Sequence, residues 1–336
     1  GVAVNVGIKV AIAEANAAGG IAGRKLRLIA EDDGYVAARA VQGVRKLIEV
    51  DKVFAMASIS ASHGLPALPV VEKAGIPAMA TTAPITHFYQ PPRKNVFAVG
   101  QSYEAGIEGL ADYLAKKFPG KKWGIVTQND DYGAALKTGL AESIKKNKIN
   151  VVYDAQYKKG QQDFSSEMLA LRASGAEIFI AGGIIVENGA MMRELEKLNV
   201  KPIVGIFWPG RVAPTYKLMG PTGDGAYAVD YVAADQSSEI KDFLARAKNV
   251  LNEAEFKAIN RYTFISYAST RVLIEAIKRC AKDLTWACAI AELEKTKNLE
   301  TGVMGPISFG PGVRFSSQKL TIMQTDLATL SSKPVD

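Results

Sequence analysis

The sequence predicts an α/β protein with two domains, each built on a parallel sheet. The chain has 336 residues, which at roughly 150 residues per domain suggests about two domains. Short apolar runs alternate with helix-like stretches, as in parallel sheets covered by helices. This alternation occurs in two series, one before residue 100 and one from about residue 122 to 208.

Hydrophobic periodicity and turn residues set the expected elements. In the first series they are helix 8–17, strand 25–30, helix 36–50, strand 53–58, helix 65–73 and strand 76–80. In the second they are helix 103–117, strand 122–127, helix 131–146, strand 150–157, helix 164–174, strand 178–181, helix 187–198 and strand 203–207. Three later helices, 239–251, 263–279 and 285–294, have no strands between them. We expect those helices to pack back on the first domain.

Composition and charge narrow the class of protein. The formal charge is +7, but the basic residues come as scattered pairs such as Lys116-Lys117 and Lys145-Lys146. Nucleic-acid binding needs a concentrated basic patch, so we expect no nucleic-acid partner. The sequence contains no run of about 18 apolar residues, so it predicts no membrane-spanning helix.

The motifs of common catalytic sites are missing from the sequence. There is no G-x-S-x-G elbow, phosphate-binding loop or G-x-G-x-x-G fingerprint. His63 follows a strand but has no nucleophile and acid arranged with it, and a catalytic role for it is the weaker interpretation. Glu31-Asp32-Asp33 is better explained as a solvated or capping turn than as a metal site. We therefore expect no enzyme activity, no cofactor and no metal.

Cys280 and Cys288 are the two cysteines of the chain and lie between two expected helices. In an oxidising compartment they would close a short disulfide across the helix–helix corner. The alternative is a pair of unrelated buried thiols.

Several motifs together resemble the type I solute-binding proteins of the leucine–isoleucine–valine receptor family. They occur in the family's order and at about its spacing across nearly the whole chain. The motifs are AIAEANAAGGIAGR at 11–24, LRLIAEDD at 26–33, AGIP at 74–77, NDDYG at 129–133, GQQDF at 160–164 and GPISF at 305–309.

The resemblance implies the periplasmic-binding-protein type I fold, with two Rossmann-like lobes joined by a three-crossover hinge that closes on ligand. The crossovers are expected near 98–103, 229–235 and 305–318. The N-terminal lobe would comprise 1–101 plus 234–306, and the C-terminal lobe 102–233 plus 307–336. The family begins with a strand that the given chain does not contain, so that strand lies upstream or is missing. A periplasmic or extracytoplasmic location, with a leader upstream, is also implied.

In the first lobe, the family holds the ligand's carboxylate with hydroxyl and backbone N–H groups after two strands. The matching residues here are Ser60, Ala61 and Ser62 in one loop and Ala80 and Thr82 in the other. Ala61 replaces the family's usual serine, so a neighbour would supply the hydroxyl. Helices beginning near Leu65 and Ile85 would add positive helix ends. The alternative is that these serines and threonines make ordinary turns.

In the second lobe, Tyr132 matches the family's ligand-contacting tyrosine. Amino-acid receptors of the family carry a polar aromatic residue after the next strand and an acid after the following one, where this chain has Ile184-Ile185 and Phe207-Trp208. A buried ammonium without a partner is costly, so the ligand is expected to lack one. The expected apolar cage is Tyr103, Tyr132, Ile184, Ile185, Phe207 and Trp208.

Three residues near this expected cage have alternative roles. Phe207 and Trp208 would otherwise serve ordinary packing. Arg211 would meet a second acidic group or a phenol, or else lie on the surface. Glu187 is interpreted as a helix start and not as an ammonium partner.

The sequence thus predicts an extracytoplasmic solute-binding component of an ABC importer. Its ligand would be a small aromatic or apolar carboxylate of the benzoate, hydroxybenzoate or cinnamate type, bound in the interlobe cleft. The expected partners are this ligand and the importer's membrane subunits, with the protein itself a monomer. The alternatives are a receptor for branched-chain aliphatic amino acids and a ligand-sensing regulatory domain of the same fold.

Overall fold

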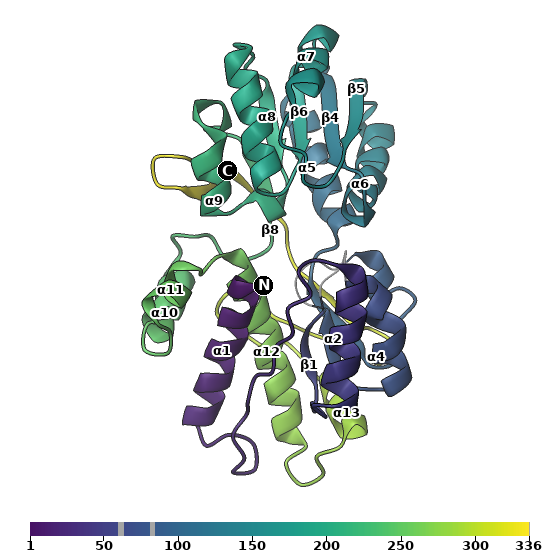
Figure 1. Cartoon of the computed structure of the whole chain (residues 1–336), viewed down its shortest axis with the longest axis vertical. Helices are drawn as coiled ribbons and strands as arrows, with labels where there is room; N and C mark the ends of the chain where they lie inside the picture. The colour runs from purple at the N-terminus through teal and green to yellow at the C-terminus, as the bar shows by residue number, and fades with distance from the viewer. Residues whose placement is uncertain (60–63, 81–84, 336) are drawn as a thin grey trace. The chain divides into compact units, whose positions relative to one another are not determined.

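The computed structural model describes residues 1–59, 64–80 and 85–335. The chain forms two compact units, and it passes from one to the other three times. The first unit comprises Gly1–Ser102 and Ser237–Lys319, and the second comprises Tyr103–Gln236 and Leu320–Asp336 (Figure 1).

A parallel sheet forms the centre of the first unit. Within the described residues its strand order is β1-β2-β3-β9, and each neighbouring pair is parallel. The strands are β1 (Met56–Ile59), β2 (Ala78–Ala80), β3 (Val96–Gly100) and β9 (Phe315–Ser317). Every residue of β2 and β3 is buried, as expected for a parallel sheet covered on both faces.

Helices from both segments of the chain complete this unit. They are α1 (Val2–Ala17), α2 (Ala37–Glu49), α4 (Leu68–Ala74), α10 (Ser238–Ala247), α11 (Glu253–Lys257), α12 (Arg261–Arg279) and α13 (Trp286–Glu294), with the 3-10 turns η1 (Leu65–Ala67) and η2 (Thr86–Phe88). The later helices pack on the first unit, as expected: α12 lies against α1 (Figure 1), and Ser266 Oγ donates to Val4 O at 2.9 Å.

The expected strand at 25–30 is wrong, because this segment forms no ladder with any described strand. A strand needs hydrogen bonds from a neighbouring chain segment. Here the side chain of Asn16 supplies them to one residue: Leu26 N donates to Asn16 Oδ1 at 2.7 Å, and Asn16 Nδ2 donates to Leu26 O at 2.9 Å.

The segment 307–319 belongs to the first unit and not, as expected from the sequence, to the second. The reason is β9, which extends the first unit's sheet by pairing with β3. In addition, Gln101 Nε2 donates to Gln318 O at 2.7 Å. The boundary therefore falls after Lys319 and not after Pro306.

The second unit contains a mixed sheet with the order β11-β10-β8-β7-β6-β4-β5 in the described residues. Its strands are β4 (Lys122–Gln128), β5 (Asn150–Tyr157), β6 (Ile178–Gly182), β7 (Ile203–Ile206), β8 (Tyr227–Asp230), β10 (Thr321–Asp326) and β11 (Ser331–Pro334). The strands β4 to β8 are parallel, whereas β10 is antiparallel to both its neighbours.

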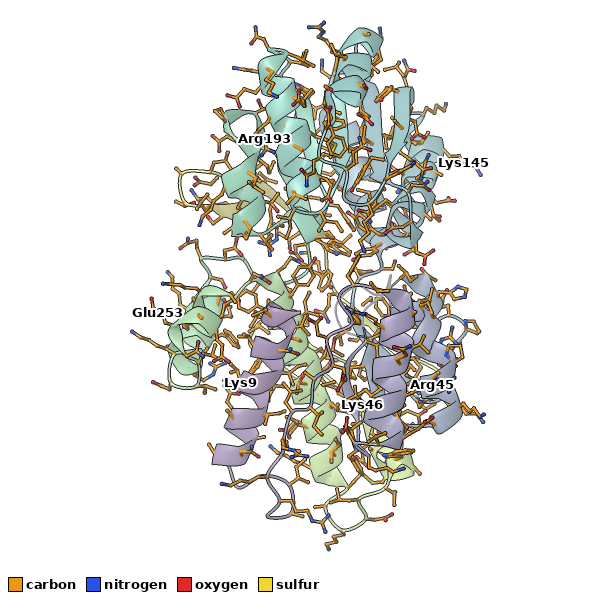
Figure 2. All side chains as sticks on the ribbon, viewed as in Figure 1. Lys9, Arg45, Lys46, Lys145, Arg193 and Glu253 are labelled. Atoms are coloured by element: carbon orange, nitrogen blue, oxygen red, sulfur yellow. A yellow bond between two sulfur atoms is a disulfide. The ribbon has the colours of Figure 1, made fainter. Side chains whose placement is uncertain are left out.

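The helices of the second unit flank its sheet (Figure 1). They are α5 (Tyr103–Lys117), α6 (Asp131–Asn147), α7 (Ser165–Ser174), α8 (Val186–Lys197) and α9 (Ala213–Met219), with the 3-10 turns η3 (Trp208–Gly210) and η4 (Pro221–Gly223). The apolar faces of α7 and α8 meet the sheet in one core that includes Phe179, Met191 and Leu195. Charged side chains such as Lys145 and Arg193 project from the outside of the unit (Figure 2).

Of the helices that the structure describes, none is both long and apolar enough to cross a bilayer. The same residues contain no group of three or more His, Cys, Asp or Glu side chains placed to hold a metal ion.

Candidate functional site

The second unit has a topological switch point between β4 and β6. From β4 the chain adds β5 on one side, then returns to add β6, β7 and β8 on the other. In open α/β sheets, ligands bind at the carboxyl ends of the strands beside such a point. Three strand-end segments, called loops below, meet this criterion. They are 129–132 after β4, which includes the first residues of α6, 183–185 after β6, and 207–210 after β7, which includes η3.

Tyr132 bridges the first two of these loops. Asp130 caps α6 by accepting a hydrogen bond from Gly133 N at 3.1 Å, which fixes Tyr132 in the first turn of the helix. The Tyr132 hydroxyl then donates to Gly183 O at 3.3 Å. Tyr132 is 2% exposed, so its ring belongs to the floor of the switch point.

Aromatic rings from four segments form one cluster beside Tyr132. Tyr103 lies at the start of α5. Its ring centroid is 5.1 Å from that of Tyr132, 5.4 Å from that of Phe207 and 5.7 Å from that of Trp208. Trp208 also contacts Tyr231 edge-on at 5.1 Å. Edge-on and offset ring pairs at these distances are mutually attractive. The structure therefore brings together the four aromatic residues expected from the sequence and adds Tyr231, which sequence reasoning missed.

The absence of a side chain at Gly106 lets Phe207 and Trp208 pack against α5. A Cβ built on Gly106 would lie 2.0 Å from Trp208 Cζ3 and 3.0 Å from Phe207 Cε2, so both rings pack directly on the backbone of α5. Both side chains are fully buried. Packing against α5 is thus a definite role for these two residues, and any contact with ligand would be in addition to it.

Ile184 and Ile185 differ from these rings because they are half-buried. They lie between Gly183 and the start of α8. With Tyr103 and Tyr132 they give the switch point an apolar and aromatic lining.

Arg211 does not have the surface position considered from the sequence as one alternative. Its side chain is fully buried, and Nε lies 2.5 Å from Asp230 Oδ2. Its Nη1 donates to both carboxylate oxygens of Asp235, at 3.0 and 3.1 Å, and to Ser332 Oγ at 3.0 Å. The acidic group that Arg211 meets is therefore intramolecular, because β8 ends in Asp230 directly beside the η3 loop.

Asn188, which sequence reasoning missed, lies fully buried in the first turn of α8. Its side chain accepts from Gly183 N at 3.0 Å and donates to Gly183 O at 3.2 Å and Ile184 O at 3.0 Å. An asparagine shortly after a Gly-Gly strand end is the only signal in the sequence that pointed to it.

Glu187 lies in the first turn of α8, which begins one residue earlier than expected, and it is 7% exposed. Ionised carboxylates are rarely buried to this degree unless something compensates the charge. Glu187 is therefore a buried acidic side chain directly after the loop that follows β6, and it is included in the candidate site.

Most of the first-unit residues expected to hold a carboxylate lie outside the described residues. Ser60, Ala61, Ser62 and Thr82 are in this position. Ala80 is described: it ends β2 and is 1% exposed. The expected helix near Ile85 is only the three-residue turn η2, so it offers no full helix end, whereas the one near Leu65 exists as η1 leading into α4.

Cys280 and Cys288 form a disulfide that joins the end of α12 to the first turns of α13. The bond therefore braces the helix–helix corner of the first unit.

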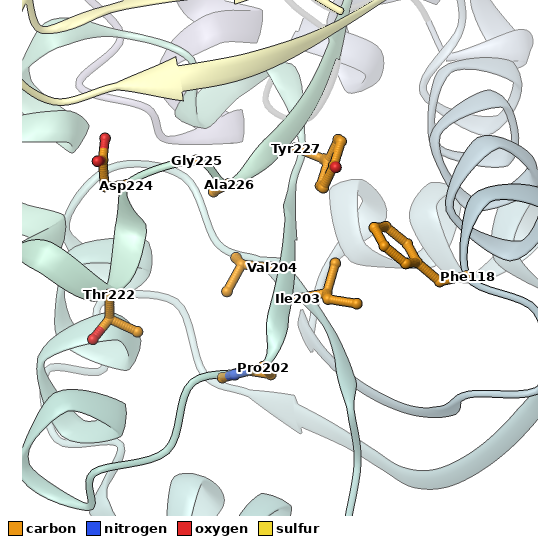
Figure 3. A pocket seen from close by; sticks show the side chains of 9 residues that line it. All are labelled: Phe118, Pro202, Ile203, Val204, Thr222, Asp224, Gly225, Ala226 and Tyr227. Atoms are coloured by element: carbon orange, nitrogen blue, oxygen red, sulfur yellow. The ribbon is translucent and has the colours of Figure 1, made fainter.

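A small cavity of about 190 Å³ lies at the amino ends of strands in the second unit's sheet. Phe118 and Tyr227 face it from one side, and the beginnings of β7 and β8 line it (Figure 3). It lies at the amino ends of these strands, away from the switch point, and falls below the ~300 Å³ at which small-molecule sites usually begin.

The parallel sheet, its switch point and its apolar strand-end loops define a ligand-binding α/β protein. The chain belongs to the periplasmic binding protein family, whose model matches residues 1–331. The expected fold, with two α/β lobes of the periplasmic-binding-protein type I kind, is thereby confirmed. The family is one of binding proteins and not a class of enzymes.

Individual relatives differ in the ligands they are named for. The chain is 25% identical over 326 residues to the Leu/Ile/Val-binding protein homolog 3 of Brucella melitensis, which covers 96% of this chain and 86% of that protein. A branched-chain amino acid ABC transporter structure from Thermus thermophilus with bound valine has a TM-score of 0.89 at 15% identity, covering 99% of this chain and 90% of that one. A solute-binding protein from Rhodopseudomonas palustris in complex with 3,4-dihydroxybenzoic acid has a TM-score of 0.83 at 20% identity, covering 96% and 88%.

Proposed function

We propose that this protein is the extracytoplasmic solute-binding component of an ABC importer and that its ligand is a small aromatic or apolar carboxylate. Benzoates, hydroxybenzoates and cinnamates are the compounds of this class that we favour. The protein would act as a monomer and deliver the ligand to the importer's membrane subunits. Membership of the periplasmic binding protein family supports the class of function.

One observation carries the choice of ligand: the loops after β6 and β7 contain Ile184-Ile185 and Phe207-Trp208. None of these four side chains offers a carboxylate to an ammonium group. Arg211, the first charged side chain after Trp208, is committed to Asp230 and Asp235. An apolar or aromatic body is the ligand group that such loops bind with least desolvation cost.

The carboxylate of the ligand would be met by the first unit. Ser60, Ser62 and Thr82 would supply hydroxyls, and the loops that contain Ala61 and Ala80 would supply backbone N–H groups. Hydrogen bonds to a charged acceptor are roughly twice as strong as neutral ones, so a few such donors suffice.

A thermal-shift screen tests the proposal. The purified protein is heated with benzoate, 4-hydroxybenzoate, 3,4-dihydroxybenzoate, cinnamate, leucine, isoleucine and valine. A ligand that binds only the folded state raises the melting temperature by mass action. We expect a rise with one or more aromatic acids and none with the amino acids; a rise with the amino acids alone would refute the proposed ligand class.

The second candidate is a receptor for branched-chain amino acids, and the burial of Glu187 favours it. This carboxylate lies two residues after Ile185 and is 7% exposed, so it is placed to answer an ammonium near the β6 loop. The name of the Brucella relative points the same way.

Replacing Glu187 separates the two candidates. Under the amino-acid hypothesis, Glu187→Gln abolishes a shift seen with leucine; under the aromatic-acid proposal, it leaves the shift with 4-hydroxybenzoate in place. Glu194→Gln is the matched control, because Glu194 is on the same helix and pairs with Lys197 at the surface.

A further inference from the structure

We infer that Asn188 is the positioning residue of the candidate site: its buried amide holds the loops after β4, β6 and β7 in one arrangement. We call the hydrogen bonds of the Asn188 amide to the loop after β6 the clasp. The role of the clasp in ligand binding rests on the proposed function, but its existence does not. Asn188 would act through the backbone of these loops without contacting the ligand.

The hydrogen bonds of Asn188 fix the loop after β6. Its Oδ1 accepts from Gly183 N, and its Nδ2 donates to the carbonyl oxygens of Gly183 and Ile184, at distances of 3.0 to 3.2 Å. Both amide hydrogens and the amide oxygen are therefore used, which fixes the orientation of the side chain. The backbone before Ile185 is thus held at three points by one side chain.

Two further contacts link this loop to its two neighbours, one through Gly183 and one through Asn188 itself. Gly183 O, which accepts from Asn188, also accepts from the Tyr132 hydroxyl, at 3.3 Å, and so joins the start of α6 to the clasp. On the other side, a Cβ built on Gly210 would lie 2.4 Å from Asn188 Nδ2 and 2.9 Å from Ile184 O. Only glycine allows the η3 loop, which carries Trp208, to approach this closely.

The chemistry of the clasp is specific to an amide. Aspartate has nearly the same shape but would point carboxylate oxygens at two carbonyl oxygens and lose both donated bonds. Alanine would leave Gly183 N and Ile184 O, which lie in a buried region, without these partners. Either change should loosen the three loops before it affects the remainder of the sheet.

The chain offers a matched control in Asn95 of the first unit. Asn95 is 2% exposed, and its Nδ2 donates to Val71 O at 2.9 Å and Ile76 O at 2.7 Å. It therefore clasps backbone as Asn188 does, but away from the switch point. Asn95→Ala should cost a comparable set of hydrogen bonds while leaving the three loops intact.

Amide hydrogen exchange of the unliganded protein tests the clasp directly. In Asn188→Asp and Asn188→Ala, we expect exchange at least tenfold faster in peptides covering 129–132, 183–186 and 207–212, with peptides inside β4 and β5 at the wild-type rate. In Asn95→Ala, the faster exchange should be confined to the first unit. Wild-type exchange of 183–186 in both Asn188 variants, or a uniform increase across all strands of the second unit, would overturn the inference. The aspartate variant, having the same shape, keeps the test available if the alanine variant does not fold.

Binding of 4-hydroxybenzoate, measured by calorimetry, then tests the functional role. We expect affinity at least tenfold weaker in Asn188→Asp and within twofold of wild type in Asn95→Ala. Equal affinities in wild type and Asn188→Asp would overturn the positioning role in ligand binding. If wild type itself binds no compound of the thermal-shift screen, the proposed function fails, and the exchange experiment still decides whether the clasp exists.

Discussion

Arg211 Nε lies 2.5 Å from Asp230 Oδ2, and both side chains are fully buried. The pair joins the η3 loop, which carries Trp208, to the end of β8. Asp230 Oδ1 in turn accepts from Tyr231 N at 2.7 Å, so the carboxylate also orders the turn that carries another ring of the aromatic cluster. The buried pair thus fixes the η3 loop from the side opposite to Asn188's loop.

Breaking this pair should lower the free energy of unfolding by a large amount. Arg211→Met leaves Asp230 buried without its cation, and such losses cost about 3–5 kcal/mol. The double variant Arg211→Met/Asp230→Leu removes both charges and should recover a large part of that cost. Denaturant unfolding followed by tryptophan fluorescence measures both. A cost below about 1 kcal/mol for the single variant would contradict a buried pair, being the size expected for a surface one.

Gly106→Ala should destabilise the second unit, although alanine normally favours a helix interior. The usual gain is about 0.5–1 kcal/mol. Here the new methyl group would lie 2.0 Å from Trp208 Cζ3 and 2.3 Å from Cη2, and forced overpacking costs about 1–3 kcal/mol. We expect a lower melting temperature and a changed tryptophan emission. Gly106→Ser tests the same clash with a larger side chain and should lower the melting temperature at least as much. A stabilised Gly106→Ala protein would show that Trp208 does not pack on α5.

Asp112 should make the α5–α6 pair sensitive to acid. Partial burial raises the pKa of Asp112, but hydrogen bonds from Lys146, Ser143 and Asn147 outweigh it, so the pKa falls below the ordinary 3.8. A lowered folded-state pKa contributes stability that is fully present above pH 3.8 and is lost as the pH falls through the folded-state value. Asp112→Asn should therefore weaken the dependence of stability on pH below about 4. Denaturant midpoints at several pH values measure this, and parallel curves for wild type and variant would contradict it.

The disulfide should stabilise the first unit by a modest amount. The cysteines are separated by 8 residues, and closing a loop of this size removes about 2–3 kcal/mol of chain entropy from the unfolded state. Cys280→Ser/Cys288→Ser should lower the denaturant midpoint by a corresponding amount. Dithiothreitol should lower the midpoint of wild type but not that of the double variant. If the reductant has no effect on wild type, the cysteines are not paired.

The regular elements were largely predictable from local sequence. The helix Tyr103–Lys117 and the strand Asn150–Tyr157 have the bounds that their periodicity indicates. Strands β3 and β8 were missed although turn residues precede both, because Val96–Gly100 and Tyr227–Asp230 lie at the expected crossovers. The three short strands β9, β10 and β11 near the end of the chain were missed as well. The expected strand 25–30 shows the converse case: it has suitable residues but no described strand beside it. Strand formation depends on distant partners, which a local pattern does not contain.

The candidate site was predictable as a set of strand-end loops but not as a set of contacts. The family pattern placed Tyr132, Ile184 and Phe207 at the correct strand ends. It gave no sign that Trp208 packs on Gly106, a residue about one hundred positions earlier, or that Arg211 pairs with Asp230. Asn188 was missed for a related reason: its role depends on the orientation of one amide toward three backbone groups.

Calorimetric titration of the refolded, ligand-free protein with 4-hydroxybenzoate and with leucine tests the central claim most directly. Refolding from denaturant removes any ligand carried through purification. The apolar loops after β6 and β7 predict saturable binding of 4-hydroxybenzoate and no heat with leucine. Saturable binding of leucine, lost in Glu187→Gln and retained in Glu194→Gln, with no binding of 4-hydroxybenzoate, would contradict the account and identify an amino-acid receptor.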